Sequence, residues 1–191
     1  MLKTTDISIW KVVECHIDVF PNSLYNKFGK EFLIETFSWY LINPDKRKLL
    51  SFERENIVCG FLTMRATEDK DNFYRYIFPI FLQSIFRHPK AIINKKFFRK
   101  IFSQFIPNNN LVKESSSMEL VSLGVRKQNR SEGIATNLLN EFERISKLYS
   151  YNKLVLSVRE NNSNAIDFYL NHGWAISNRP VDNYLILKKE L

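Results

Sequence analysis

Cysteine is scarce in this 191-residue sequence, which contains only Cys15 and Cys59. Two cysteines provide neither a disulfide framework nor the spacing of a metal site, so we expect buried thiols in a reducing compartment. The histidines His16, His88 and His172 are scattered and have no partners at ligand spacing. We therefore expect no bound metal ion.

Long apolar runs are also missing. No stretch of about 18 apolar residues is present that could span a bilayer, and the N-terminal residues lack the uninterrupted apolar run of a signal peptide. Internal repeats and low-complexity tracts are absent as well. Because 45% of the residues are hydrophobic, we expect a single folded domain over residues 1–191, located in the cytoplasm.

Acidic residues are absent between Asp71 and Glu114, although the chain as a whole is well supplied with them. The basic residues of this interval account for the entire net charge of +8, so the rest of the chain is balanced. The excess charge therefore needs a local explanation. These basic residues are Arg75, Arg87, Lys90, Lys95, Lys96, Arg99, Lys100 and Lys113.

The most regular stretch, residues 118–149, has the pattern of a strand, a basic turn and a long helix. Leu120–Val125 is mostly apolar, as in a strand that is buried on both faces. In the helix, apolar residues recur every three or four positions and so share one face. These residues are Ile134, Leu138, Phe142, Ile145 and Tyr149.

The turn between this strand and helix, Arg130–Ala135, is suited to binding an anion. The first N–H groups of a helix have no partner within it, and the helix dipole makes that end partly positive. Gly133 and Ala135 leave the approach to these donors open, and Arg130 adds a permanent charge. We therefore predict that the turn binds phosphate or pyrophosphate.

The same six residues resemble the pattern Arg/Gln-x-x-Gly-x-Gly/Ala, the acyl-CoA pyrophosphate signature of the GNAT superfamily of N-acetyltransferases. A second block, residues 153–174, is similar to the family pattern L-x-V-x-x-x-N-x-x-A-x-x-x-Y-x-x-x-G-F. The resemblance covers roughly the last 75 residues. The matching residues of the second block are Leu156, Val158, Asn162, Ala165, Tyr169 and Gly173, with Trp174 in place of Phe.

The resemblance implies an α/β fold with a central, mostly antiparallel mixed sheet of about six or seven strands, flanked by helices. It also implies a helical insertion at about 68–113 between strands three and four, and an acyl-CoA-binding core at about 118–174. The reaction implied is transfer of an acyl group from acyl-CoA to an amine, without a metal ion.

The resemblance also suggests which residues bind acyl-CoA. Family members spread strands four and five apart so that the pantetheine amides pair with the edge of strand four, where Gly124 would suit a bulge or a close backbone approach. Asn162 would serve the cofactor through its amide, cap the next helix, or do both. The predicted cofactor-binding residues are Leu123, Gly124, Val125, Arg130, Ser131, Glu132, Gly133, Ile134, Ala135, Thr136, Asn162 and Tyr169.

Two residues are predicted to transfer protons. Tyr169 matches the family's general acid, which protonates the departing thiolate; the alternative is a tyrosine of the core. Glu119 lies where the histone-modifying branch of the family carries its basic Glu, and it would need burial or a water relay to act as a base. The alternative is a glutamate at the strand start that faces solvent.

The remaining elements follow from periodicity and turn signals. Asp6 is predicted to cap the first helix. Expected helices cover 6–19, 24–41 (one or two), 72–87, 89–95, 95–105 and 163–171; expected strands cover 48–53, 57–66, 153–158, 174–178 and 184–189.

The aromatic and basic insertion leaves four interpretations open. It could form a pocket for an anionic small-molecule amine, a surface for nucleic acid or the ribosome, a membrane-surface or homodimer element, or merely a core with a solvated face. We favour the first, with a nucleotide-linked amino sugar of surface-polysaccharide synthesis as acceptor and no nucleic-acid partner. The alternatives are acetylation of a protein or peptide amine, as in ribosomal-type members, and a CoA-binding module without transfer activity.

Overall fold

The computed structural model describes residues 1–69, 73–88, 116–177 and 183–191. The helices predicted over 89–95 and 95–105 lie outside the described residues, as do the basic residues from Lys90 to Lys113. Among the described residues, no helix combines the length and the apolar character needed to cross a bilayer.

A seven-stranded mixed sheet forms the centre of the molecule, with strand order β1-β2-β3-β4-β5-β7-β6. Of the paired strands, β4 and β5 run parallel and the others antiparallel, which confirms the predicted sheet. Strand β1 was not predicted, because two residues carry no alternation. The strands are β1 (Leu2–Lys3), β2 (Arg47–Arg54), β3 (Ile57–Ala66), β4 (Met118–Val125), β5 (Lys153–Arg159), β6 (Ala175–Ile176) and β7 (Tyr184–Glu190).

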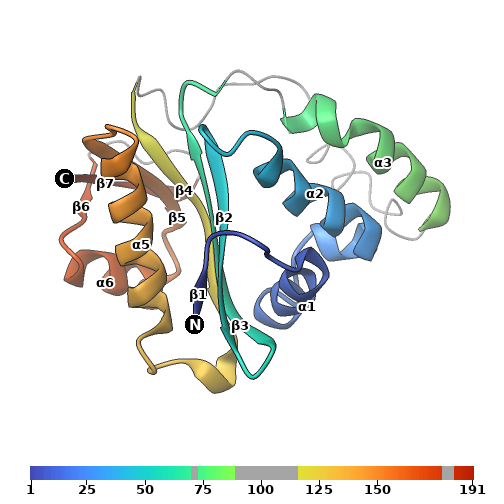
Figure 1. Cartoon of the computed structure of the whole chain (residues 1–191), viewed down its shortest axis with the longest axis horizontal. Helices are drawn as coiled ribbons and strands as arrows, with labels where there is room; N and C mark the ends of the chain where they lie inside the picture. Colours follow the sequence, from blue (N-terminus) through green and yellow to red (C-terminus); the bar gives the residue numbers. More distant parts are fainter. Residues whose placement is uncertain (70–72, 89–115, 178–182) are drawn as a thin grey trace.

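Helices cover both faces of this sheet (Figure 1). One face, here called the α5 face, carries α5 (Ile134–Leu148) and α6 (Ser163–Asn171). The other, the α1–α2 face, carries α1 (Ile9–Val19) and α2 (Lys30–Ile42), with the short helix η1 (Tyr25–Phe28) between them. Helix α3 (Phe73–Arg87) packs on the outer side of α2 and on η1.

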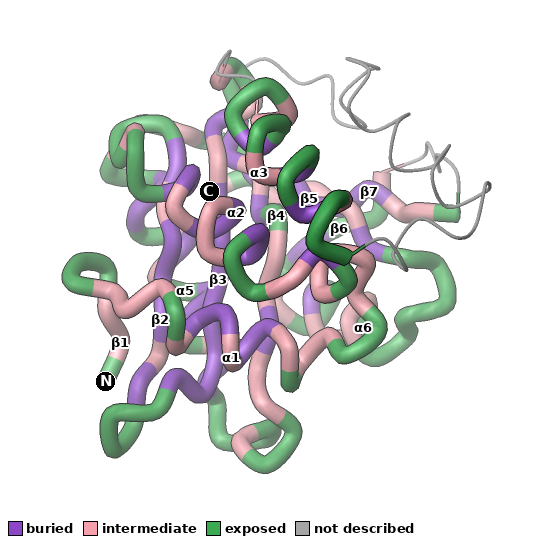
Figure 2. Tube along the Cα trace, turned by 90° about the vertical axis from the view of Figure 1, so that its right-hand side faces the viewer, coloured by how far each residue is buried: buried purple, intermediate pink, exposed green. Residues whose placement is uncertain are grey.

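Most of the apolar stripe predicted for α5 is buried against the sheet. Ile134, Leu138, Phe142 and Ile145 are at most 3% exposed. Burying each such side chain stabilises the fold by roughly 1.5–3 kcal/mol. Strand β3 contributes to both cores, since it is buried along most of its length (Figure 2). Side chains of β3 that point to the α5 face meet α5, and Phe61 packs on α1 and α2 instead.

Two local predictions need correction or refinement. The first helix begins at Ile9, and its N-cap residue is Ser8, not the predicted Asp6. Asp6 adopts a left-handed conformation, with φ of 52°, before the helix begins. The helix predicted over 72–87 is confirmed as α3, which contains Pro79 in its interior.

Strand β4 pairs with β3 along its length, but with β5 only at its start. Parallel pairing with β5 ends at Leu120, opposite Leu156. The ladder between β3 and β4 skips Val121, which therefore forms a β-bulge. After this bulge, residues 121–125 pair with no part of β5, so the middle of the sheet opens between these two strands.

Candidate active site

The loop from β4 to α5 presents a row of unused main-chain donors. The N–H groups of residues 131–136 donate to no acceptor within the described part of the chain; the first helical hydrogen bond runs from Asn137 N to Gly133 O at 2.9 Å. Successive free N–H groups at a helix start form a site for an anion. Residues 131–136 thus present the free main-chain donors that an anion site requires.

The backbone of this loop requires unusual dihedral angles. Ser131 and Gly133 both have positive φ, at 64° and 75°. A Cβ atom at Gly133 would meet no atom within 4 Å, so the space over the helix start is open. Gly133 therefore serves both the turn and the approach of a ligand.

The two arginines near this loop differ in how far their side chains are already engaged by other residues. Arg130 is exposed, and its Nε donates to Val125 O at 3.4 Å. Arg126 is committed elsewhere, because it forms an ion pair with Asp18 and donates to Val58 O at 2.8 Å. Arg130 is therefore the better placed of the two to meet an anion at the loop.

Glu132, a predicted cofactor-binding residue, forms an ion pair with Arg54 at 2.6 Å. Arg54 ends strand β2, and sequence analysis did not connect it with the site. The side chains of Arg54 and Glu132 are 52% and 33% exposed. The pair places a second guanidinium beside the anion-binding loop.

The open edge of β4 has a defined hydrogen-bonding pattern. Arg126 N donates to Cys59 O at 2.8 Å, and in an antiparallel ladder hydrogen-bonded pairs alternate with unbonded ones. Leu123 and Val125 therefore direct their main-chain groups away from β3 and into the opening. The main-chain N–H and C=O groups of Gly124 point toward β3.

Gly124 allows a close side-chain approach instead of forming the bulge. A Cβ atom there would lie 2.9 Å from Val19 Cγ1 and 3.1 Å from Phe20 Cε2. Neither predicted role is therefore found at Gly124: the atoms that approach it are side chains of α1 and its C-cap in place of backbone, and the bulge lies at Val121.

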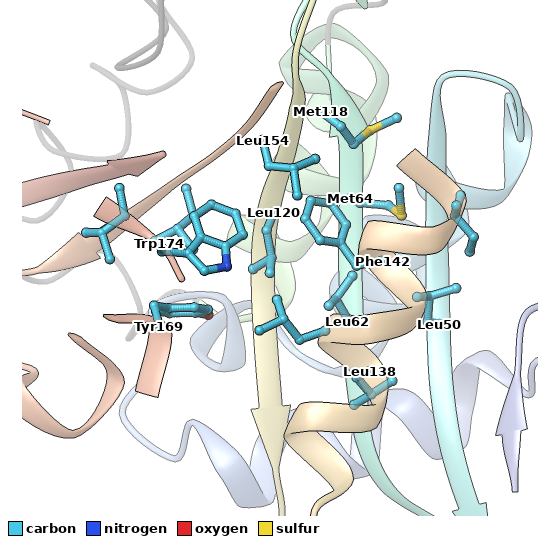
Figure 3. Packing of buried hydrophobic residues seen from close by; sticks show 14 of the residues in the cluster. Leu50, Leu62, Met64, Met118, Leu120, Leu138, Phe142, Leu154, Tyr169 and Trp174 are labelled. Carbon is cyan, nitrogen blue, oxygen red and sulfur yellow. The ribbon is translucent and has the colours of Figure 1, made fainter. Parts of the chain in front are cut away.

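Tyr169, the predicted general acid, lies in the core of the α5 face at 7% exposure. Its ring contacts Trp174 at a centroid distance of 5.8 Å, and its oxygen points toward β4 (Figure 3). Burial raises the pKa of the phenol above its ordinary value. The phenol has no hydrogen-bond partner among the described residues, so its proton is free for a bound molecule.

Asn162 is confirmed as the N-cap of α6. Its side chain accepts a hydrogen bond from Ala165 N at 3.3 Å. The side-chain amide nitrogen has no partner in the described ranges. Capping and cofactor contact are therefore compatible at this residue.

Glu119 does not face bulk solvent. It lies opposite Arg65 on β3, and Arg65 Nε donates to its Oε2 at 2.7 Å. Its neighbours Met118 and Leu120 belong to the core of the α5 face, so Glu119 points to the α1–α2 face. Tyr169 and Glu119 thus belong to opposite faces of the sheet.

Comparison with known proteins finds a family match for part of the chain. Residues 102–174 match the model described as "Acetyltransferase (GNAT) family". Residues 102–174 thus carry the sequence of a GNAT acetyltransferase domain. The reaction of such a domain is acyl-CoA-dependent N-acyl transfer, with acyl-CoA as co-substrate. No curated protein matches the sequence.

Solved structures share the fold of this chain. The PaiA N-acetyltransferase of Thermoplasma acidophilum, in complex with coenzyme A, is 14% identical with a TM-score of 0.61, over 100% of this chain and 99% of that one. The ribosomal-protein-alanine N-acetyltransferase of Brucella melitensis is 17% identical with a TM-score of 0.61, over 100% and 99%. A GNAT acetyltransferase of Staphylococcus aureus Mu50 is 12% identical with a TM-score of 0.61, over 100% and 98%. At such identity the likeness is one of fold.

His172 has a structural role at the start of α5. Its Nδ1 lies 2.7 Å from Phe168 O, so we assign the ring proton to Nδ1. Its Nε2 then accepts from Thr136 Oγ1 at 3.1 Å. The predicted cofactor residue Thr136 is thereby tied to the end of α6, and its N–H stays free for an anion.

The structure brings most of the predicted site residues to the edges of one opening between β4 and β5. Arg54 and Arg65 were missed, since a single arginine in a strand has no distinctive pattern. Alternation along β3 could have shown which face of the sheet Arg65 lies on, because Arg65 shares that face with Thr63 and Phe61. Among the described residues, no group of three His, Cys, Asp or Glu side chains could hold a metal ion.

Proposed function

We propose that the protein transfers an acetyl or other short acyl group from acyl-CoA to the primary amine of a small anionic acceptor, a nucleotide-linked amino sugar. The row of free N–H groups at residues 131–136 is the observation that supports the transfer reaction most directly. With the open edge of β4, it fits an extended carrier that ends in a diphosphate.

The residues would hold this co-substrate as follows. The N–H groups of residues 131–136 would bind the diphosphate, with Arg130 as a nearby charge. The main-chain groups of Leu123 and Val125 would pair with the amides of the pantetheine arm. When bound, acyl-CoA supplies an acyl group activated as a thioester.

Two side chains would manage the protons. An alkylammonium with a pKa of about 10 costs about 4 kcal/mol to deprotonate at pH 7. Glu119 would take this proton on Oε1, which has no partner among the described residues, while Arg65 holds Oε2. Tyr169 would donate its proton to the sulfur as the C–S bond breaks and the N–C bond forms, and the second proton that the nitrogen loses would restore the phenol. The products are then a neutral amide and a thiol, and the proton held by Glu119 passes to solvent.

The choice of an anionic acceptor rests on charge. Helix α3, on the outer side of α2, contains Arg75 and Arg87 and no acidic residue. A compact basic segment in an otherwise balanced chain suits a pocket wall better than an extended nucleic-acid surface. Acetylation of a protein or peptide amine is the second candidate, and the fold shared with the ribosomal-protein-alanine N-acetyltransferase is the observation in its favour.

The test is thiol release from acetyl-CoA in the presence of amine acceptors. Aminated nucleotide sugars, polyamines and short peptides would be compared at fixed salt. We expect the nucleotide sugars to give the highest kcat/KM. If the peptides exceed them, the second candidate is correct. CoA binding without turnover on any acceptor would show a binding module.

A further inference from the structure

Arg65 and Glu119 form an ion pair on the side of the sheet opposite α5. They face each other across β3 and β4, with Nε and Oε2 2.7 Å apart and side chains 30% and 12% exposed. The co-substrate features described above use neither Arg65 nor the α1–α2 face. The pair therefore requires an explanation on the acceptor side.

Tyrosines from three helical elements interact electrostatically with Arg65. They are Tyr25 of η1, Tyr40 of α2 and Tyr74 of α3. Burial raises the pKa of Tyr40 to about 12 and raises the pKa of the other two phenols as well, so all three are neutral at pH 7. The ion pair thus lies among aromatic rings and neutral hydrogen-bonding groups, a combination typical of small-molecule sites.

The position of the pair connects it to the reaction. Glu119 lies two residues before Val121, the bulge after which β4 separates from β5. A molecule that reaches the opening from the α1–α2 face would meet Arg65 and Glu119 there. An amine near Glu119 would be close to the point where the two strands diverge.

We propose that Arg65 binds an anionic group of the acceptor, a carboxylate or a phosphate next to the amine, while the amine lies against Glu119. This inference rests on the proposed function, because it concerns the acceptor of the same reaction. An acceptor that carries both groups would pair its anion with Arg65 and its ammonium with Glu119. Every charge would then keep a partner of opposite sign. A lone ammonium beside Glu119 would instead be repelled by the guanidinium. Arginine is suited to the role, since its planar fork fits a carboxylate or phosphate.

The experiment compares amines with and without a neighbouring acid. Glucosamine 1-phosphate, whose phosphate is on the carbon next to the one that bears the amine, is paired with glucosamine, and alanine with alaninamide, and kcat/KM is measured for each. We expect the acid-bearing member of one pair to be favoured by about tenfold or more. The favoured pair distinguishes a phosphate from a carboxylate.

Variants of Arg65 then assign the preference to this residue. We expect Arg65→Gln to bring the ratio to about one, and Arg65→Lys to keep part of it, because lysine retains the charge but not the fork. The KM for acetyl-CoA should not change in either variant. The control is Arg144→Gln on the outer side of α5, where Arg144 pairs with Glu141 at 2.8 Å; it should leave every ratio unchanged.

Each outcome either supports or overturns the role proposed for Arg65. A ratio near one for both pairs in the natural protein, or an undiminished ratio in Arg65→Gln, overturns the inference. If Arg65→Gln does not fold, an undiminished ratio in Arg65→Lys overturns it equally. If no amine at all is acetylated, the proposed function itself has failed.

Discussion

On the α5 side of the sheet the part of the candidate site that would bind the co-substrate is built mainly from main chain, whereas on the α1–α2 side the site is built from side chains. The first consists of the free N–H groups of residues 131–136 and the open edge of β4. The second consists of Arg65 and Glu119 with the tyrosines that interact with Arg65. A main-chain site depends on where a strand ends and a helix begins, so one short motif specifies it. A side-chain site requires several elements to bring single residues together.

The largest expected effect tests a side chain on the α5 side, Tyr169. Replacing it by Phe removes the buried hydroxyl and keeps the ring contact with Trp174. We expect kcat to fall by about 10²- to 10⁴-fold with little change in CoA affinity, because the proton donor is lost and the main-chain site is not. Steady-state kinetics and calorimetric CoA titration measure the two quantities.

The control for this change is Tyr149→Phe, at the other end of α5 and about 22 Å along the helix axis from Ile134. It should leave kcat unchanged. An equal loss of turnover and CoA affinity in Tyr169→Phe would show that the tyrosine is structural, and the division between main chain and side chain on this face would no longer hold.

The second effect concerns His16, which lies in the core of the α1–α2 face between Phe20, Phe37 and Phe61. Burial lowers its pKa from 6.5 to about 4. The unfolded chain therefore binds a proton before the folded one does, and stability should fall by about 3 kcal/mol as pH decreases from about 6.5 to 4. Urea unfolding at a series of pH values measures this dependence.

His16→Phe removes the titrating group and keeps an aromatic ring in the cluster. Between pH 6.5 and 4, the stability of this variant should change by about 3 kcal/mol less than that of the natural protein. An identical pH dependence in both proteins would contradict the assignment and would locate the acid-sensitive group elsewhere.

The third effect tests the packing of α1 on β4. Gly124→Ala would place a methyl group 2.9 Å from Val19 Cγ1, so we expect a loss of about 1–3 kcal/mol in the free energy of unfolding. Adding Val19→Ala removes the nearest contact. The double variant should therefore be less destabilised than the sum of the two single ones. Additive losses in urea unfolding would show that the close approach is not the cause.

The smallest effect separates the two roles of Asn162. Asn162→Ala removes the N-cap of α6 and should cost about 1 kcal/mol of stability. Asn162→Ser keeps a capping oxygen but shortens the side chain. If Asn162 also contacts the co-substrate, the Ser variant should keep its stability and still raise the KM for acetyl-CoA. An unchanged KM in both variants would leave capping as the role of the residue.

The sequence predicted the α5 side well and the α1–α2 side poorly. The loop at Gly133, the cap at Asn162 and the stripe of α5 each depend on local pattern, and the structure contains all three. The partnership of Arg65 with Glu119 joins residues 54 positions apart in the chain. Neither periodicity nor a motif encodes such a pair, because it depends on strand register, which the bulge at Val121 shifts by one residue.

The opening between β4 and β5 creates two sheet edges inside the molecule, where most sheets have them only at the outside. Unpaired edges at the outside of a sheet attract the strands of other proteins and favour aggregation. Here α5 flanks the opening on one side and α1 on the other (Figure 1). A polypeptide strand in the opening would carry side chains above and below its backbone, toward the faces that these helices cover, whereas an unbranched chain of amides and methylenes carries none. The narrower chain is therefore the better match to an edge that lies between two helix-covered faces, before any charge or functional group is recognised.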